Sequence, residues 1–210
     1  LYLSYLLKYK YNFSIGDEPM PANFTKEEKA TLIRKFYKQG YILLKKFGYK
    51  KLKIVDIASS VGIGTGTFYN FFKSKDEFII WLIKKRKDET IEQFLSLSKE
   101  YPNGIPMSAF EQFLFDTISH NNIYRCLTQE DYNILQEKYG LLDNRNEKIK
   151  ENAKFMMSKL TTTKSIDDFF LFSEAYTIII IGTSDLNKLN PKLTDKIVKN
   201  FIHSACQFLY

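Results

Sequence analysis

The sequence of 210 residues predicts an all-α fold with a short N-terminal helical domain and a longer C-terminal helical bundle. Five Pro and nine Gly are few for this length, which favours helices with short connections. Apolar residues recur at three- and four-residue spacing, and neither strand alternation nor an internal repeat stands out. We therefore expect about nine helices.

The first helices are predicted from their capping residues and apolar spacing. Thr25 is a good N-cap for a helix over 26–47, with Glu27 and Glu28 in the first turn and Gly48 at its end. Shorter helices fit residues 53–60 and 65–72, and Ser74 caps a fourth helix that continues to about Ser98.

The turn-forming residues 101–106 (YPNGIP) are the clearest break in the chain. Beyond them, helical patterns cover residues 107–119, 122–138, 144–160, 165–182 and 193–209. We assign residues 1–24 to an N-terminal extension, 25–75 to the first domain and 76–210 to the bundle.

Charge is unevenly distributed. Residues 24–87 hold sixteen Lys or Arg against five Asp or Glu, whereas the rest of the chain holds fifteen against nineteen. A basic segment joined to a mildly acidic one is typical of a nucleic-acid-binding module attached to a different module, although Lys-rich surfaces also occur on other helical proteins. Two cysteines are too few for a disulfide framework, and no apolar run is long enough to span a bilayer, so we expect a cytoplasmic protein without a membrane partner.

Three glycines at alternate positions, Gly62, Gly64 and Gly66, raise the question of a phosphate-binding loop. A dinucleotide loop needs glycine at the first, third and sixth positions after a buried strand, but the sixth position here is Thr67 and the preceding residues have helical spacing. No P-loop string occurs either. The better interpretation is a helix-turn-helix, in which Gly62 makes the turn.

The second helix of such a unit lies in the DNA major groove. With Phe68 and Phe72 inward, the helical wheel turns Gly66, Asn70 and Lys73 outward and puts Thr67 and Tyr69 on the flanks. The outward face is small and polar, so it can approach base edges.

Residues 47–78 resemble the DNA-binding domain of the tetracycline-repressor (TetR) family of bacterial transcription regulators. That family has a glycine and an aromatic after its first helix, an Ile-Ala pair, a Gly-Val-Ser-x-Gly-Thr-Leu-Tyr string and a Phe-x-Ser-Lys-Glu-x-Leu string. The matching residues here are Gly48–Tyr49, Ile57–Ala58, Gly62–Tyr69 and Phe72–Phe78. The resemblance covers about residues 25–80.

The resemblance implies a double-stranded DNA partner and a set of contact residues. It places Thr67, Tyr69 and Lys75 at the DNA backbone, and Thr65, Gly66, Asn70 and Phe71 at bases or sugars. Lys53 replaces the usual Thr or Ser; it can reach a phosphate but cannot cap the helix. Phe71 replaces a commonly polar residue, and two interpretations stay open: contact with a thymine methyl, or packing.

The C-terminal aromatics also allow two interpretations. An aromatic stripe at helical spacing is usually core. The resemblance implies instead a helical bundle that holds a small, often apolar or aromatic effector, and the candidate lining residues are Phe110, Phe113, Tyr124, Tyr132, Phe155, Phe170 and Tyr176.

The last two helices have very apolar faces, which are either buried within one chain or paired with a second chain. The resemblance implies the second arrangement, a homodimer whose interface residues are Phe169, Phe172, Ile179, Phe201, Ala205 and Phe208. Two recognition helices about 34 Å apart would read a palindromic operator.

No catalytic residues, metal site or cofactor are predicted. The scattered residues His120, Cys126, His203 and Cys206 form no cluster with metal-ligand spacing, and no Ser, His and acid arrangement stands out. We expect a homodimeric repressor released from its operator by a small molecule. The alternative is a DNA-organising or partner-controlled protein on the same scaffold without an effector.

Overall fold

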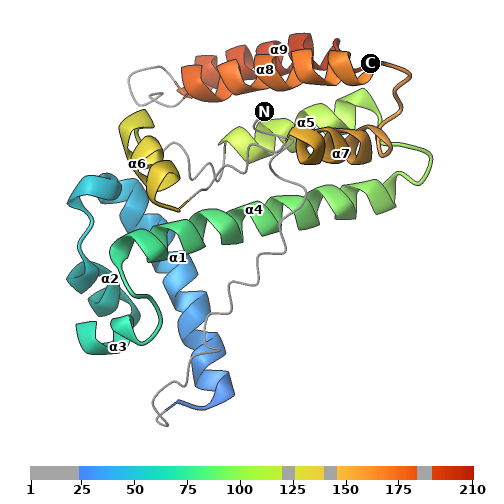
Figure 1. The fold of residues 1–210 in the computed structure, drawn as a ribbon. Coiled ribbons are helices and arrows are strands. Elements are labelled where there is room, and N and C mark those ends of the chain that lie inside the picture. Colours follow the sequence, from blue (N-terminus) through green and yellow to red (C-terminus); the bar gives the residue numbers. More distant parts are fainter. Residues whose placement is uncertain (1–23, 120–125, 140–145, 184–190) are drawn as a thin grey trace. The chain divides into compact units, whose positions relative to one another are not determined.

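The computed structural model describes residues 24–119, 126–139, 146–183 and 191–210. Over these residues the chain is helical and has no strand, which confirms the predicted all-α class (Figure 1). The helices are α1 (Lys26–Lys51), α2 (Ile54–Val61), α3 (Thr65–Tyr69), α4 (Lys75–Glu100), α5 (Met107–Ser119), α6 (Gln129–Tyr139), α7 (Asn146–Met157), α8 (Ile166–Gly182) and α9 (Pro191–Cys206). None of the helices in these ranges is both long and apolar enough to cross a membrane.

The described residues form two compact units. The N-terminal unit comprises residues 24–86 and 126–139, and the C-terminal unit comprises residues 87–119, 146–183 and 191–210. Helix α4 contributes its first half to the N-terminal unit and its second half to the C-terminal unit. The sequence-based boundary at residue 75 therefore falls at the start of α4, and α6 belongs with the N-terminal unit despite its distance along the chain.

Helix α1 begins as predicted, at a capping box. The Thr25 hydroxyl accepts a hydrogen bond from the Glu28 N–H, and the Glu28 carboxylate accepts one from the Thr25 N–H. Hydrogen bonding of the Glu28 carboxylate to the Thr25 backbone N–H, and then to the Thr25 hydroxyl, holds the pKa of Glu28 below its usual value. At the predicted end, Gly48 has a φ of 69°, so the chain kinks there and completes a further turn to Lys51.

The core of the N-terminal unit is a cluster of aromatic rings around Phe36 of α1. The ring of Phe36 lies 5.9 Å from that of Phe68, 5.3 Å from that of Phe72 and 6.0 Å from that of Phe78. All four side chains are almost fully buried. Because Phe68 belongs to α3 and Phe72 lies just beyond it, these contacts hold the helix-turn-helix against α1 and α4.

The C-terminal unit has a separate core, in which α9 packs on α5 and α8. Phe110, Leu114, Phe172 and Tyr176 are fully buried there. The Tyr176 hydroxyl donates a hydrogen bond to the Leu114 carbonyl oxygen, 3.1 Å away, so this buried polar group is satisfied.

Candidate nucleic-acid interface

Helix α2 and helix α3 are joined by the tight turn that the glycine pattern predicts. Gly62 ends α2 in the left-handed conformation, with a φ of 82°, and its N–H donates to the carbonyls of Ala58 and Ser59. The Ile63 N–H donates to the Ala58 carbonyl at 3.0 Å. These bonds satisfy the last carbonyls of α2 and set the direction in which α3 leaves the turn.

Helix α3 is shorter than predicted. It begins at Thr65 and ends at Tyr69, whereas the prediction extended to residue 72. Gly64 stands at the N-cap and gives no side-chain hydrogen bond. Beyond the helix, the Phe71 and Phe72 N–H groups both donate to the Phe68 carbonyl, so a tight turn replaces the last predicted turn of helix.

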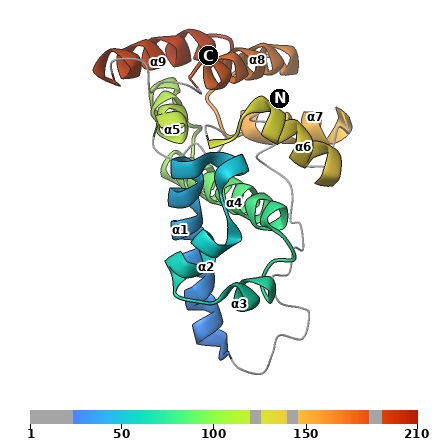
Figure 2. The ribbon, with the colours of Figure 1, turned by 90° about the vertical axis from the view of Figure 1, so that its left-hand side faces the viewer.

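Helix α3, which Figure 2 shows next to α2, has an exposed side. Exposed residues on and next to α3 are Thr65, Gly66, Tyr69, Asn70 and Lys73, and Thr67 is half-buried. A Cβ atom added at Gly64 or Gly66 would meet no atom within 4 Å. Tyr69 is 53% exposed. The structure therefore gives α3 the small, polar outer face that the helical wheel predicts.

The structure corrects the prediction that the Phe71 side chain faces DNA. Its side chain is only 7% exposed, and its ring centroid lies 5.3 Å from that of Phe36. The end of α3 at Tyr69 changes the helical register, so residue 71 turns inward. Of the two interpretations of Phe71, packing is the one that the structure supports.

Lys75 belongs to a small polar cluster with Tyr49 and Asp76. The Lys75 ammonium donates to the Tyr49 carbonyl oxygen at 2.8 Å and lies 4.6 Å from the centre of the Tyr49 ring. The Tyr49 hydroxyl donates to the Asp76 carboxylate at 2.6 Å. The cation thus sits at the end of α1, where the exposed carbonyls favour positive charge.

Asp76 also connects the cluster to α6. Its carboxylate lies 3.1 Å from the Lys138 ammonium, and the Glu130 carboxylate of α6 lies 2.5 Å from the Lys50 ammonium. Burial raises the pKa of Asp76, but the hydrogen bonds from Tyr49 and Lys138 and the nearby positive charges outweigh it. The pKa of Asp76 therefore lies below its usual value.

Sequence reasoning missed the roles of Tyr49, Asp76 and α6 in supporting Lys75. The residues that meet there are 26 and 62 positions apart. Spacing within single helices carries no signal for such contacts. The remaining predicted backbone contact, Lys53, is exposed at the start of α2, where its side chain makes no capping hydrogen bond.

The predicted effector-lining residues do not line one cavity among the described residues. Phe110 and Tyr176 are fully buried in the core, Phe155 is exposed, and Phe113 and Phe170 are half-buried. Tyr124 and the Tyr132 side chain lie outside what the structure describes. For Phe110 and Tyr176 the structure thus supports the plainer interpretation, an aromatic core.

The predicted dimer residues divide into two groups. Phe169 and Phe172 are fully buried in the C-terminal core, so they are not available to a partner. Phe201 and Phe208 are exposed, and Ile179 and Ala205 are buried side chains that border a surface groove between α8 and α9. The assignment failed for Phe169 and Phe172 because α8 is apolar around most of its circumference, so the sequence does not show which side faces inward.

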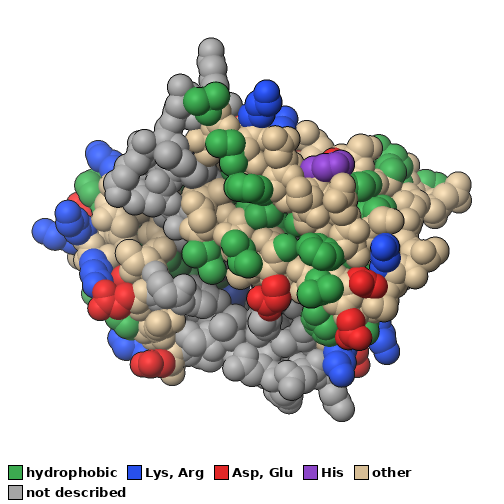
Figure 3. Space-filling model, turned by 90° about the horizontal axis from the view of Figure 1, so that it is seen from above, with side chains coloured by type: hydrophobic (Ala, Val, Ile, Leu, Met, Phe, Trp, Pro, Cys, Tyr) green, Lys and Arg blue, Asp and Glu red, His purple; other side chains and the backbone are tan. Residues whose placement is uncertain are grey.

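Helices α8 and α9 carry several exposed apolar residues, and Figure 3 shows hydrophobic side chains on the face that it views. The exposed apolar residues are Leu171, Ile178, Ile181, Leu193, Ile197, Phe201 and Phe208, which we call the α8–α9 face. Ile178 is 69% exposed, Ile181 62% and Phe201 56%. The groove along this face has a volume of about 510 Å³.

The comparison with protein families agrees with this geometry. The model of a family described as bacterial regulatory proteins, tetR family, matches residues 37–80, from the middle of α1 through α2 and α3 into α4. No match to the chain was found among the curated proteins. Residues 37–80 therefore match the DNA-binding domain of tetR-family proteins, and this match supports a DNA-binding transcriptional regulator.

Proposed function

We propose that the protein is a homodimeric, cytoplasmic repressor that binds a palindromic operator and leaves it when a small molecule binds the C-terminal unit. The observation that carries the proposal is the open face of α3, held by buried Phe68 and Phe72 and matched to the tetR family. This face is small and polar, as the approach to base edges in the DNA groove requires.

Asn70 is the side chain best suited to read a base. It is exposed at the end of α3, and an amide side chain can make a bidentate pair with adenine. Tyr69 and Lys75 would hold the DNA backbone, Tyr69 through its exposed side chain and Lys75 through its charge. Thr65, Gly66 and Thr67 let the chain come close to the groove.

A five-residue helix reads few base pairs, so specific binding requires a second copy. The α8–α9 face supports a homodimer. Contiguous exposed apolar surface on a soluble protein usually marks an interaction site, and a two-fold axis would place the same face of each copy against the other.

Release by an effector follows from a population shift. In some dimers the two α3 helices would be spaced wrongly for the operator. A small molecule that binds only these dimers lowers the fraction of DNA-competent protein, in proportion to the difference between its affinities for the two forms. A protein of the alternative kind, which organises DNA without an effector, would lack this response.

The test is selection of bound sequences from a random DNA pool with the full chain. We expect enrichment of a palindrome whose half-sites lie about one helical turn apart. Enrichment of no sequence by folded protein would contradict the proposal and favour a sequence-independent DNA binder.

A further inference from the structure

Tyr49 is buried because α1 kinks one residue before it. On an unbroken helix, Tyr49 would lie on the same face as Ile42 and Lys45, seven and four residues earlier, and both of these side chains are exposed. Gly48 breaks this register with its φ of 69°, and Tyr49 is only 8% exposed. The kink therefore turns an aromatic ring away from the surface of α1 and toward the start of α4.

The backbone carbonyl and the ring of Tyr49 both meet the ammonium group of Lys75. The ammonium donates to the carbonyl oxygen at 2.8 Å and lies 4.6 Å from the centre of the ring, within the range of a cation–π contact. Lys75 is the first residue of α4, and the Ser74 hydroxyl supports this helix start by accepting from the Glu77 N–H at 3.1 Å. The long Lys75 side chain is thus held at both ends.

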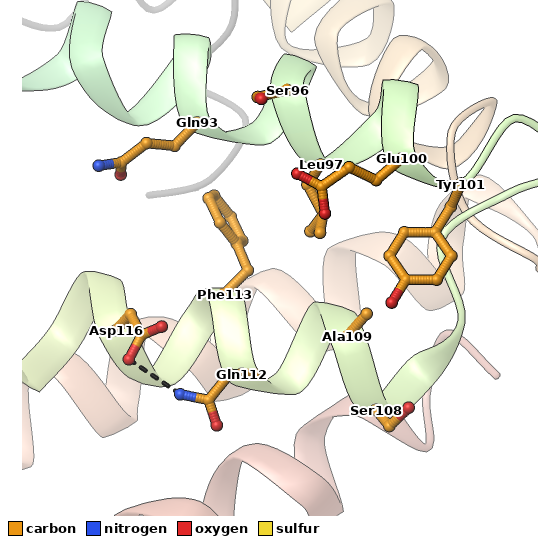
Figure 4. A pocket seen from close by; sticks show the side chains of 10 residues that line it. All are labelled: Gln93, Ser96, Leu97, Glu100, Tyr101, Ser108, Ala109, Gln112, Phe113 and Asp116. Carbon is orange, nitrogen blue, oxygen red and sulfur yellow. Dashed lines mark hydrogen bonds between the residues drawn. The ribbon is translucent and has the colours of Figure 1, made fainter.

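A hydrogen bond between two helices fixes the ring itself. The Tyr49 hydroxyl donates to the Asp76 carboxylate at 2.6 Å, which joins α1 to α4 across 27 positions. The bond from Gln112 to Asp116, drawn in Figure 4, connects successive turns of one helix, and such a bond by itself does not orient one helix against another. The Tyr49–Asp76 bond does, so it holds the ring in one orientation beside Lys75.

We propose that Tyr49 is a positioning residue for DNA binding, which holds the Lys75 ammonium ready for a phosphate of the DNA backbone. This inference rests on the function proposed above, in which Lys75 contacts that backbone. An ammonium group has several N–H donors, so the bond to the Tyr49 carbonyl leaves others for a phosphate oxygen. A lysine that is already ordered also loses less rotamer freedom on binding than an unrestrained one.

The charge of this cluster also suits a phosphate. Asp76 would repel an anion, but its carboxylate is shared between the Tyr49 hydroxyl and the Lys138 ammonium, which lies 3.1 Å away. The ammonium groups of Lys75 and Lys138 thus stand against one carboxylate, and the surplus positive charge favours an anion.

The test is a double-mutant cycle on the DNA affinity of the full chain, measured by fluorescence anisotropy with a duplex selected from the random pool and a scrambled duplex. Tyr49→Leu should weaken binding to both duplexes about two- to tenfold per half-site, the factor that corresponds to ordering one long side chain. In a Lys75→Met background, Tyr49→Leu should have no further effect. Tyr49→Phe keeps the ring and should retain most of the affinity.

Salt dependence separates positioning from a merely structural role of the pair. Lys75→Met should lower the slope of log affinity against log salt concentration by about 0.9 per half-site, because one phosphate contact is lost. An unaltered slope would make Lys75 a structural residue and overturn the proposal. Equal losses from Tyr49→Leu with and without Lys75 would also overturn it.

Phe115→Leu is the matched control. The Phe115 ring is 7% exposed and its centre lies 4.5 Å from the Lys199 ammonium, so this variant removes an equally buried ring from beside a lysine of the C-terminal unit. It should bind both duplexes like the unaltered protein, and thermal unfolding checks that each variant is folded.

NMR of the chain with isotope-labelled lysine tests the geometry without DNA and without a change at Tyr49. The ring should shift the ε-methylene signals of Lys75 upfield, and Lys75→Met identifies these signals by their loss. Lys75 signals at the position of an exposed lysine such as Lys38 would overturn the proposal, even if Tyr49→Leu does not fold.

The outcomes also distinguish this inference from the proposed function. Sequence-specific binding with additive effects of Tyr49→Leu and Lys75→Met would leave the function standing and overturn the positioning role. Absence of DNA binding by the folded, unaltered chain would overturn both.

Discussion

At the scale of single residues, Asn70 is the side chain on which sequence preference should depend most. It is exposed, so Asn70→Ala should leave stability unchanged. We expect the substitution to relax base preference at one operator position, by about 1–3 kcal/mol if the amide pairs with adenine. Fluorescence anisotropy with operator duplexes altered one base pair at a time would measure this.

The control for Asn70 is Tyr69→Ala. Loss of a backbone contact should weaken binding to the operator and to a scrambled duplex by the same factor. An equal loss on both duplexes for Asn70→Ala would contradict its base-reading role.

Phe71 is expected to affect stability and not DNA recognition directly. It is 7% exposed and packs against Phe36, so Phe71→Ala should lower the free energy of unfolding by about 3–5 kcal/mol. Urea denaturation would measure the change. A variant of unaltered stability that binds the operator more weakly would restore the thymine-contact interpretation.

The pKa of Asp76 predicts an acid-sensitive contribution to stability. Because its folded-state pKa is lowered, ionised Asp76 stabilises the fold above the pKa of the unfolded chain, about 3.9. The contribution is lost as the pH falls through the lower folded-state value. The stability difference between the unaltered protein and Asp76→Asn should therefore be larger at pH 7 than at pH 3.

Urea denaturation at the two pH values would measure that difference, and Asp56→Asn controls for the loss of a negative charge from the same unit. A difference for Asp76→Asn that stays constant between pH 7 and pH 3 would contradict the hydrogen bonds assigned to its carboxylate.

At the scale of helices, α1 and α4 approach closely at Gly40. A Cβ atom there would lie 2.4 Å from the Phe78 ring, which is fully buried among other aromatics and has little room to move. Gly40→Ala should therefore destabilise the protein by about 1–3 kcal/mol. Gly66→Ala is the matched control, since its Cβ atom meets nothing within 4 Å.

Thermal unfolding compares the two glycine variants. We expect a lower melting temperature for Gly40→Ala and an unchanged or slightly higher one for Gly66→Ala, because alanine is the better helix former. Equal melting temperatures would mean that α1 and α4 are not in close contact at this point.

The helices of the N-terminal unit could largely be predicted from the sequence because their signals are local. The cap at Thr25, the left-handed Gly62 and the spacing of Phe68 and Phe72 each act within a few residues. The end of α3 was missed because Phe71 packs on Phe36, a contact across 35 positions that helical spacing does not reveal.

The placement of α6 and the inner side of α8 could not be predicted, because both depend on contacts between residues far apart in the sequence. Helix α6 joins the N-terminal unit through Lys138 and Glu130, whose partners lie on α4 and α1. The inner side of α8 depends on which of its many apolar residues meet α9, and a helix apolar on most sides does not specify that choice.

At the scale of the whole molecule, the α8–α9 face should decide whether two copies associate. Phe201→Glu places a charge on an exposed part of this face, so the chain should still fold while the dimer dissociates. Sedimentation velocity should show a shift from dimer to monomer at the same protein concentration. Lys199→Glu is the control, because it changes charge at an exposed residue of α9 outside the groove.

A Phe201→Glu protein that remains dimeric would place the dimer interface elsewhere. Loss of association with retained folding should also remove tight operator binding, since each half-site alone makes few base contacts.

The proposed function depends on sequence-specific DNA binding by α3. The most direct measurement is the ratio of affinities for the selected palindrome and a scrambled duplex of equal length, determined by anisotropy in about 0.15 M salt. We predict a ratio of at least about 10³, the lower end for specific DNA-binding proteins. Equal affinities for the two duplexes would contradict the claim that the open face of α3 reads DNA sequence.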